Sequence, residues 1–347
     1  MNNQDKIAAL GNIVSQKKVL ILTHNNPDPD AIAAGWALAF LIRKKFKSHA
    51  QLAYGGLIAR AENRAMVRML NIDIQPLESL NLSDFDVYAL VDTQPRAGNN
   101  SLPAHLKPSI VIDHHGARKS LQGVDFVEIR LDYGSSATIL TEYLLQAGLP
   151  ISRAMATALY LGLKTDTQNL GRHATEVDYN AAVALYPKVQ LRILSHIEFP
   201  DLAREYFIDF DRGLHEAKIF GKVIFCDLGH LTNTDMVALM ADFFLRFAEI
   251  SWSFVMGMSD SSLIFSLRTK RANLNAGQVA RRMVKGLGTA GGHNRTGGGQ
   301  IRIKDISPER AEKMRQSIQK RFLRYAGQEN TPGVQLLPDM SWIQGMT

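Results

Sequence analysis

Short apolar runs that end at a carboxylate or an imidazole recur through the first half of the chain. Residues 19–23, 85–91 and 109–112 are such runs, and they lead into His24, Asp92 and Asp113. Strand-like runs that alternate with helical segments are typical of a parallel sheet with helices on both faces. Ligands of such sheets bind beyond the carboxyl ends of the strands. The pattern therefore predicts an α/β fold with these side chains gathered at one edge of a single sheet.

The length and composition indicate a two-domain globular protein. The chain has 347 residues, of which 46% are hydrophobic and 21% charged, which argues against disorder. We expect a catalytic domain at residues 1–190, a helical linker at 191–221 and a smaller α/β domain at 222–330. An irregular tail at 331–347 completes the expected organisation.

Several classes of protein are excluded by simple counts. The single cysteine, Cys226, rules out a disulfide framework and a cysteine-based zinc site. The first residues lack the apolar core of a signal peptide, and no apolar run approaches the roughly 20 residues of a membrane span. We therefore expect a soluble cytoplasmic protein with no membrane partner.

The positive charge is concentrated in the second half of the chain. Residues 262–325 contain fifteen Lys or Arg and three acids, and residues 262–304 contain nine bases and no acid. The rest of the chain therefore carries about −5, the difference between the total of +7 and the local +12. An acidic half and a basic half suggest an anionic substrate between them. The alternative is a solvated cationic face.

The first acidic motif enters a helix through a loop with two prolines. His24 and Asp28 lie four residues apart, and Asp30 follows two positions later. Prolines favour extended backbone, so the carboxylates at 28 and 30 can point toward different metal ions. The alternative is a helix amino terminus with acids that interact favourably with its dipole.

Further carboxylates and histidines follow downstream. Asp113 is followed directly by His114 and His115, an arrangement that is unusual in a purely structural role. Asp92 alone would more often be a turn residue. Asp166 ends another apolar stretch, and residues 154–163 are expected to form a helix that ends near it. Clustered carboxylates need a counter-charge. Two divalent cations are the simplest one, and such a pair on carboxylates and imidazoles indicates hydrolysis at phosphorus.

These motifs together resemble a known family. His24-x3-Asp28-x-Asp30-Ala31, Asp92-Thr93, Asp113-His114-His115 and Thr165-Asp166-Thr167 resemble motifs I to IV of the DHH phosphoesterase superfamily. Ser266-Leu267-Arg268-Thr269 and Gly291-Gly292-His293-x3-Gly297 resemble its DHHA1 domain. The resemblance covers residues 16–305 and is greatest to the nanoRNase/pAp-phosphatase branch.

The resemblance implies a role for each residue of the metal centre. One metal, usually Mn²⁺, would be held by His24, Asp28 and Asp92, and a second by Asp30, Asp92, His114 and Asp166, with Asp92 as the bridge. Mg²⁺ or Co²⁺ are expected substitutes for Mn²⁺. His115 would face the substrate, and Asp113 would orient an imidazole.

The resemblance also assigns the substrate side, where the chain departs from the family pattern. Arg268 would contact a terminal phosphate, and a loop over residues 286–299, with Gly291, Gly292 and His293, would approach an anion. Arg295 stands where the family has a small residue. Gln168-Asn169-Leu170 replaces the usual glycine and aromatic after motif IV. These departures leave the predicted metal ligands unchanged. They concern the residues expected to determine which substrate is bound.

The leading function implied is hydrolysis of short oligoribonucleotides. Linear dinucleotides such as pApA and pGpG would give nucleoside monophosphates in a cleft between the domains, and pAp is a further substrate. The alternatives are a pyrophosphatase or exopolyphosphatase, or a cyclic-dinucleotide phosphodiesterase, on the same centre. A catalytically silent nucleic-acid-binding subunit is a third class, against which the intact ligands count. A homodimer is compatible with the resemblance.

Overall fold

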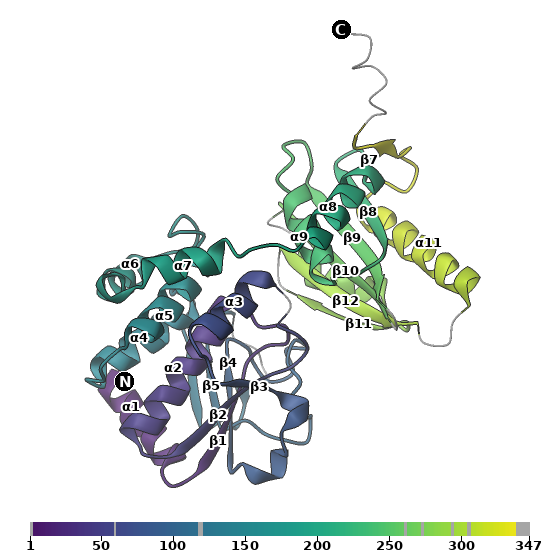
Figure 1. Ribbon diagram of the computed structural model, residues 1–347. Helices are drawn as coiled ribbons and strands as arrows, with labels where there is room; N and C mark the ends of the chain where they lie inside the picture. Colours follow the sequence, from purple (N-terminus) through teal and green to yellow (C-terminus); the bar gives the residue numbers. More distant parts are fainter. Residues whose placement is uncertain are drawn as a thin grey trace. The chain divides into compact units, whose positions relative to one another are not determined.

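The computed structural model forms two compact units, Met1–Pro200 and Asp201–Thr347 (Figure 1). It describes residues 3–58, 60–116, 121–259, 262–271, 274–292, 295–303 and 307–337. The division falls inside the segment that we expected as a linker. Within the described residues, no helix combines the length and apolar character needed to cross a membrane.

The first unit is built around six strands. Its strands are β1 (Lys18–Leu22), β2 (His49–Tyr54), β3 (Ile74–Pro76), β4 (Val87–Val91), β5 (Ile110–Asp113) and β6 (Phe126–Ile129). Its α-helices are α1 (Asn3–Val14), α2 (Pro29–Lys45), α3 (Ala61–Met69), α4 (Ser136–Gln146), α5 (Arg153–Asp166), α6 (Glu176–Leu185) and α7 (Leu191–Glu198). The 3₁₀ helices are η1 (Leu77–Ser79), η2 (Leu82–Asp84) and η4 (Tyr186–Lys188).

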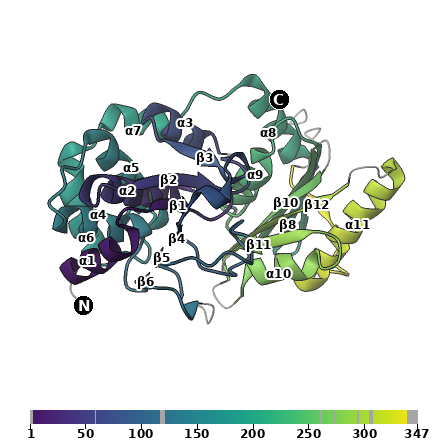
Figure 2. The ribbon, with the colours of Figure 1, turned by 90° about the horizontal axis from the view of Figure 1, so that it is seen from below.

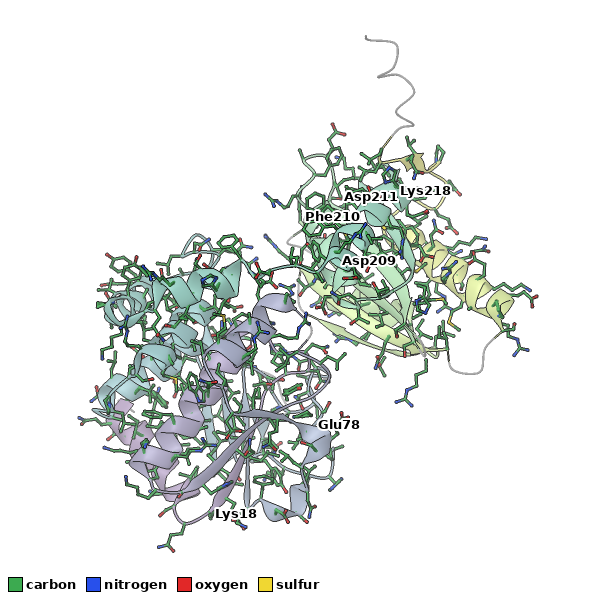
Figure 3. All side chains as sticks on the ribbon, in the orientation of Figure 1. Lys18, Glu78, Asp209, Phe210, Asp211 and Lys218 are labelled. Atoms are coloured by element: carbon green, nitrogen blue, oxygen red, sulfur yellow. The ribbon has the colours of Figure 1, made fainter. Side chains whose placement is uncertain are left out.

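The strands form one parallel sheet in the order β3-β2-β1-β4-β5-β6. Both faces are buried, so the strands read as continuous apolar runs. In β1, Val19 and Ile21 pack into the core beneath the α-helices, while Leu20 and Leu22 pack into a smaller core on the other face. Figure 3 shows Lys18 at the amino-terminal edge of this sheet, where β1 begins.

The covering of the sheet differs between its faces. Buried residues of all seven α-helices belong to the larger core. The second face is covered by side chains of η1, η2 and the loops after β4 and β5. Our expectation of helices on both faces was therefore wrong for the α-helices of the described residues. The described residues of the connections after β3, β4 and β5 form no α-helix on that side.

The strand order reverses direction between β1 and β4, which are hydrogen-bonded neighbours. The chain moves outward from β1 to β2 and β3, then returns to β4 and moves the other way. Loops at the carboxyl ends of such a pair of strands diverge and leave room for a ligand. His24 follows β1 and Asp92 follows β4, so both lie at this switch point.

The second unit is a mixed sheet between two layers of helices (Figure 2). Its strands are β7 (Lys218–Phe220), β8 (Val223–His230), β9 (Trp252–Ser259), β10 (Ser262–Thr269), β11 (Thr289–Gly292), β12 (Thr296–Arg302) and β13 (Val334–Gln335). The helices are α8 (Arg204–Glu216), α9 (Asp235–Phe244), α10 (Ala276–Met283) and α11 (Pro308–Tyr325). β8 and β9 pair in parallel and the other described pairs are antiparallel.

Alternation along the strands fills two cores. Phe225 and Phe254 face α10 and α11, whereas Cys226 and Val255 face α8 and α9. Phe254 stacks on Phe322 of α11 with ring centroids 4.7 Å apart. Such aromatic pairs add to the free energy gained from burial.

The glycine-rich stretch and the tail differ from expectation. Residues 286–299 were expected as a loop, but β11 and β12 pair there as an antiparallel hairpin. Glycine is needed because a Cβ on Gly299 would lie 2.4 Å from the carbonyl oxygen of Thr289. In the expected irregular tail, β13 pairs with β7, while residues 338–347 lie outside the described part.

Candidate metal centre

The side chains of the predicted ligands come from four segments of the first unit. His24, Asp28 and Asp30 lie on the connection from β1 into α2, Asp92 follows β4, His114 follows β5, and Asp166 is the last residue of α5. The helix expected to end near Asp166 is confirmed as α5. α5 packs beside α2, which brings its carboxyl end to the same edge of the sheet.

The structure brings these six side chains together in two groups. His24, Asp28 and Asp92 form one group, and Asp30, His114 and Asp166 form another. In each group the possible ligand atoms lie within 4.8 Å of one another. A third group of Asp92, His114 and His115 overlaps both positions. The first group has the members of one set that the resemblance implies, and the second group has those of the other set except Asp92; their role as metal ligands stays a prediction.

Asp92 lies between the two groups. Its Oδ2 is 3.4 Å from His24 Nε2 and its Oδ1 is 3.5 Å from His114 Nε2. The side chain is almost fully buried, and Ser136 Oγ donates a hydrogen bond of 2.9 Å to Oδ1. Its backbone φ is +58°, in the left-handed region that non-glycine residues rarely adopt. Asp92 therefore faces a histidine of each group.

The hydrogen bonds of the two histidines leave Nε2 directed at carboxylates. His24 Nδ1 lies 3.0 Å from the Asn25 carbonyl oxygen and His114 Nδ1 lies 3.3 Å from that of Tyr133. A carbonyl only accepts, so each Nδ1 carries hydrogen and each Nε2 of a neutral ring has a lone pair. His114 Nε2 is buried and makes no hydrogen bond of good geometry, although Asp166 Oδ2 lies 3.1 Å away. Imidazoles held this way are typical of metal ligands.

The electrostatics of the cluster call for a positive charge. Burial alone would lower the pKa of His24, but hydrogen bonds and charges from Asp28 and Asp92 raise it well above its ordinary value. Burial raises the pKa of Asp30, and the charges of Asp92 and Asp166 raise it further. Without a cation, protons serve as the counter-charge. Two divalent cations would balance the four carboxylates of Asp28, Asp30, Asp92 and Asp166 and displace these protons.

Asp30 is fixed by the amino terminus of α4. Its Oδ2 accepts a hydrogen bond from Ser136 N at 2.7 Å and its Oδ1 one from Ala137 N at 2.8 Å. Each oxygen keeps a further lone pair for a metal. Gly162 of α5 permits the close approach, because a Cβ there would lie 2.9 Å from Asp30 Cα.

Asp113 supports its neighbours and does not occur in the three ligand groups of the described residues. Its Oδ1 accepts hydrogen bonds from the backbone N of His114 and from His115 Nδ1, at 2.9 and 2.8 Å. Its Oδ2 accepts from Gln94 Nε2 at 2.7 Å. Burial would raise the pKa of Asp113, but the bond and charge of His115 and the Gln94 bond lower it to about 2.

Sequence reasoning missed Asp178, which organises the surroundings of two ligands. This fully buried side chain accepts hydrogen bonds from Gly134 N, Thr138 Oγ1 and Thr175 N. Gly134 follows Tyr133, whose carbonyl orients His114, and Thr138 lies in the first turn of the helix that holds Asp30. The capping pattern of Thr175 and Asp178 at the start of α6 was the available signal.

The predicted substrate-binding residues lie in the second unit. Arg268 is buried and engages Asp242 of α9, with Nε 2.5 Å from Oδ1, and Ser266 Oγ, 2.6 Å from Nη1. Gly291 and Gly292 are strand residues of β11, and Arg295 is exposed beside the hairpin. His293 lies outside the described residues. Contact of these residues with a phosphate stays a prediction.

The fold and the cluster define a class: an α/β protein with a candidate two-metal centre at the switch point of a parallel sheet. Residues 18–163 match the family model described as DHH family, N-terminal domain. Over these residues the chain is therefore similar to the DHH family.

Curated relatives match larger parts of the chain. An uncharacterised protein of Methanocaldococcus jannaschii is 33% identical over 285 residues, which are 82% of this chain and 58% of that protein. Across the curated relatives that it matches, the chain spans between 30% and 58% of their lengths.

Solved structures share the fold at low sequence identity. An exopolyphosphatase-related protein from Bacteroides fragilis has a TM-score of 0.69 at 15% identity, covering 91% of this chain and 96% of its own. RecJ from Thermus thermophilus, solved in complex with Mn²⁺, has a TM-score of 0.52 at 12% identity, covering 95% of this chain and 55% of its own. The expected α/β fold with two sheet domains is thereby confirmed.

Proposed function

We propose that the chain is a metal-dependent phosphoesterase that works with two divalent cations, Mn²⁺ foremost. The observation that carries the proposal is Asp92, whose two carboxylate oxygens each face the Nε2 of a different partly buried histidine. Mn²⁺ accepts this mixture of imidazole and carboxylate ligands. The RecJ structure of similar fold was obtained with the same ion.

The protein side chains supply positioning and a proton. A bound pair of divalent cations lowers the pKa of the attacking water and neutralises phosphate charge. His115 is about one third exposed, and its Nδ1 is held by Asp113 Oδ1 at 2.8 Å. Burial lowers the pKa of His115, but the Asp113 bond and the charge of Asp92 raise it above its ordinary value. The raised pKa favours the protonated ring, which can donate to the leaving oxygen.

We further propose short linear oligoribonucleotides as substrates, with pGpG and pApA hydrolysed to nucleoside monophosphates and pAp dephosphorylated. The base excess of residues 262–304 supports an anionic substrate. The second candidate is hydrolysis of inorganic polyphosphate or pyrophosphate, which the description of the Bacteroides fragilis protein favours. Cyclic dinucleotides are a third substrate class for the same centre.

A substrate panel with Mn²⁺ separates these functions. Release of nucleoside monophosphate from pGpG or pApA, without turnover of polyphosphate or pyrophosphate, is the expected result. The reverse selectivity would replace the first substrate class by the second. Asp92→Ala is expected to abolish turnover of every substrate, since the carboxylate that faces both His24 and His114 is lost. Full turnover by Asp92→Ala would contradict the proposed centre.

A further inference from the structure

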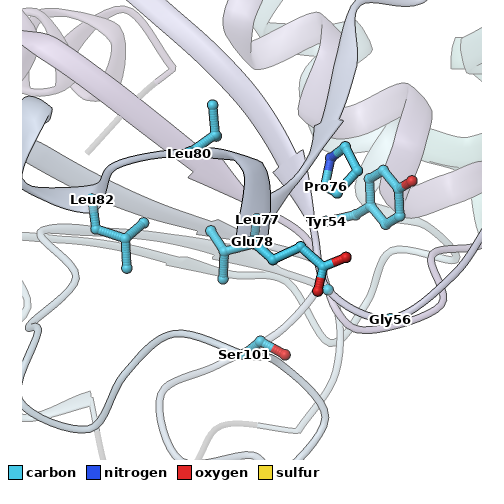
Figure 4. Close-up of a pocket in the computed structure, with 9 residues that line it drawn as sticks. Tyr54, Gly56, Pro76, Leu77, Glu78, Leu80, Leu82 and Ser101 are labelled. Atoms are coloured by element: carbon cyan, nitrogen blue, oxygen red, sulfur yellow. The ribbon is translucent and has the colours of Figure 1, made fainter.

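A cavity lies in the first unit at the carboxyl ends of β2 and β3 (Figure 4). Its volume is about 290 Å³, at the lower end of the range for small-molecule sites. Tyr54, Leu77, Leu80, Leu82, Glu78 and Ser101 are among its lining residues. Figure 4 shows Leu80 and Leu82 at one end and Tyr54 at the other, with the Glu78 carboxylate near Gly56. The proposed phosphoryl chemistry does not use this cavity.

The strand register fixes the place of the cavity relative to the metal centre. β1 pairs with β2 so that Leu22 lies opposite Ala53, which puts His24 level with Gly55 at the same edge. β2 pairs with β3 so that Tyr54 lies opposite Pro76. Neighbouring strands are about 5 Å apart, so the cavity begins one to two strand spacings from His24. One nucleotide can span that separation.

The cavity and the metal-binding loop share a wall. Ser101 Oγ donates a hydrogen bond of 2.8 Å to Asn25 Oδ1, and Asn26 N donates one of 2.9 Å to the Gly55 carbonyl. Gly55 is packed so closely that a Cβ would lie 2.1 Å from Asn25 Oδ1. Asn25 and Asn26 follow His24 directly, so a group bound in the cavity is held at a fixed position relative to the ligands.

The chemistry of the lining suits a nucleobase. Leucine side chains and the Tyr54 ring offer apolar and aromatic surface on which a flat heterocycle stacks. Glu78 offers a carboxylate, which accepts two hydrogen bonds from adjacent N–H donors. Guanine presents such a pair at N1 and N2, whereas adenine presents an acceptor at N1. A carboxylate also disfavours a polyphosphate chain at this place.

We propose that this cavity binds a guanine base of the substrate, with Glu78 as the residue that selects it. The inference rests on the proposed function, because it takes the base to belong to a nucleotide whose phosphate lies at the metal centre. It adds a preference for guanine-containing linear dinucleotides, pGpG above pApA.

Equilibrium binding of nucleosides tests the proposal without any hydrolysis. Guanosine and adenosine are titrated by NMR into the metal-free full-length protein, and guanosine is expected to bind more tightly. Glu78→Gln replaces one acceptor oxygen by a donor and is expected to weaken guanosine binding about tenfold. Adenosine binding should change less than about twofold. Glu78 is exposed on a short 3₁₀ helix, so the substitution leaves the fold intact.

Two further variants complete the design. Asp73→Asn removes a carboxylate that pairs with Arg43 outside the cavity, and should leave both affinities unchanged. Tyr54→Leu keeps an apolar side chain but removes the ring, and should weaken both nucleosides. Equal binding of guanosine and adenosine by the wild-type protein, or an unchanged guanosine affinity in Glu78→Gln, would overturn the inference. A wild-type protein that selects guanosine but hydrolyses no dinucleotide would overturn the proposed function alone.

Discussion

At the scale of single residues, Asp92 combines a buried carboxylate with an unfavourable backbone conformation. Each destabilises the fold unless neighbouring groups compensate for it. Its carboxylate is buried, its backbone is left-handed with φ +58°, and both oxygens face imidazole nitrogens. A non-glycine residue in that conformation costs about 1–3 kcal/mol unless its surroundings impose it. The bond from Ser136 Oγ and the two histidines supply those surroundings. An aspartate in an ordinary exposed turn requires neither such a hydrogen bond nor two facing histidines.

Asp113→Asn should distinguish a residue that positions His115 from a residue that binds the metal ions. The amide loses the charge that holds His115 Nδ1, so we expect kcat to fall about 10- to 100-fold while the Mn²⁺ dissociation constant stays within a few-fold. Steady-state kinetics and calorimetry measure the two quantities. Asp132→Asn, an exposed change in the same unit, should alter neither. Loss of Mn²⁺ binding in Asp113→Asn would instead make Asp113 a ligand.

Metal affinity should depend on pH through His24 and His114. Burial lowers the pKa of both rings, but their carboxylate neighbours outweigh it and raise the pKa well above the ordinary value, which favours the protonated rings in the metal-free protein. This stabilises the metal-free fold at low pH, and the effect is lost as pH rises through the raised pKa values. Mn²⁺ must displace the protons, so its affinity should rise with pH by about tenfold per unit for each proton released. Calorimetry in buffers of different ionisation enthalpy counts the protons; binding without proton release would contradict this.

At the scale of elements, helix ends place the ligands. Asp28 caps α2 through a hydrogen bond from Ala31 N, the first turn of α4 holds Asp30, and α5 ends at Asp166. Carboxylates are favoured at helix amino termini, which stabilises part of the negative cluster before any cation binds. The site therefore depends on the packing of α2, α4 and α5 as much as on its loops.

Asp178→Ala tests this dependence. The change leaves the backbone N–H groups of Gly134 and Thr175 without their acceptor, so we expect a loss of about 2–4 kcal/mol in the free energy of unfolding. Because Gly134 and Thr138 adjoin the partners of His114 and Asp30, the weaker of two Mn²⁺ binding steps should weaken further. Thermal unfolding and calorimetry measure both effects. Glu176→Ala, exposed in the same helical turn, is the control, and equal effects from the two changes would remove the special role of Asp178.

Sequence patterns predicted the elements whose residues are apolar on every side. β1, β4, β5 and α5 fall near their expected ranges because buried strands and helices leave continuous apolar runs. β3, β6 and β11 were missed, since three or four residues with exposed or glycine positions carry little periodic signal. The ligand residues were recognisable from motif spacing. Gly162 and Ser136 were not, because their roles arise from contacts between elements distant in sequence.

At the scale of the whole molecule, the two units divide the chemistry. All six candidate metal ligands lie in Met1–Pro200, whereas the strongly basic residues 262–304 lie in Asp201–Thr347. Between α7 and α8 the chain has no regular secondary structure, and Phe199 is 78% exposed. The metal centre should therefore be complete within the first unit.

Limited proteolysis tests that division. Thermolysin cuts before large apolar residues, and Leu202 is an accessible one between the units. We expect cleavage there into two stable fragments, with the amino-terminal fragment keeping the Mn²⁺ stoichiometry of the intact chain. Metal analysis after gel filtration gives the stoichiometry. A fragment that folds, as judged by circular dichroism, but binds no Mn²⁺ would show that the second unit supplies a ligand.

The shared position of Asp92 is the centre of this account, and anomalous diffraction at the manganese edge tests it most directly. Crystals of the wild-type protein grown with Mn²⁺ should show two anomalous peaks about 3.5–4 Å apart on either side of the Asp92 carboxylate. One peak should contact His24 and Asp28, and the other His114 and Asp166. A single peak, or peaks that do not contact Asp92, would contradict the two-metal centre.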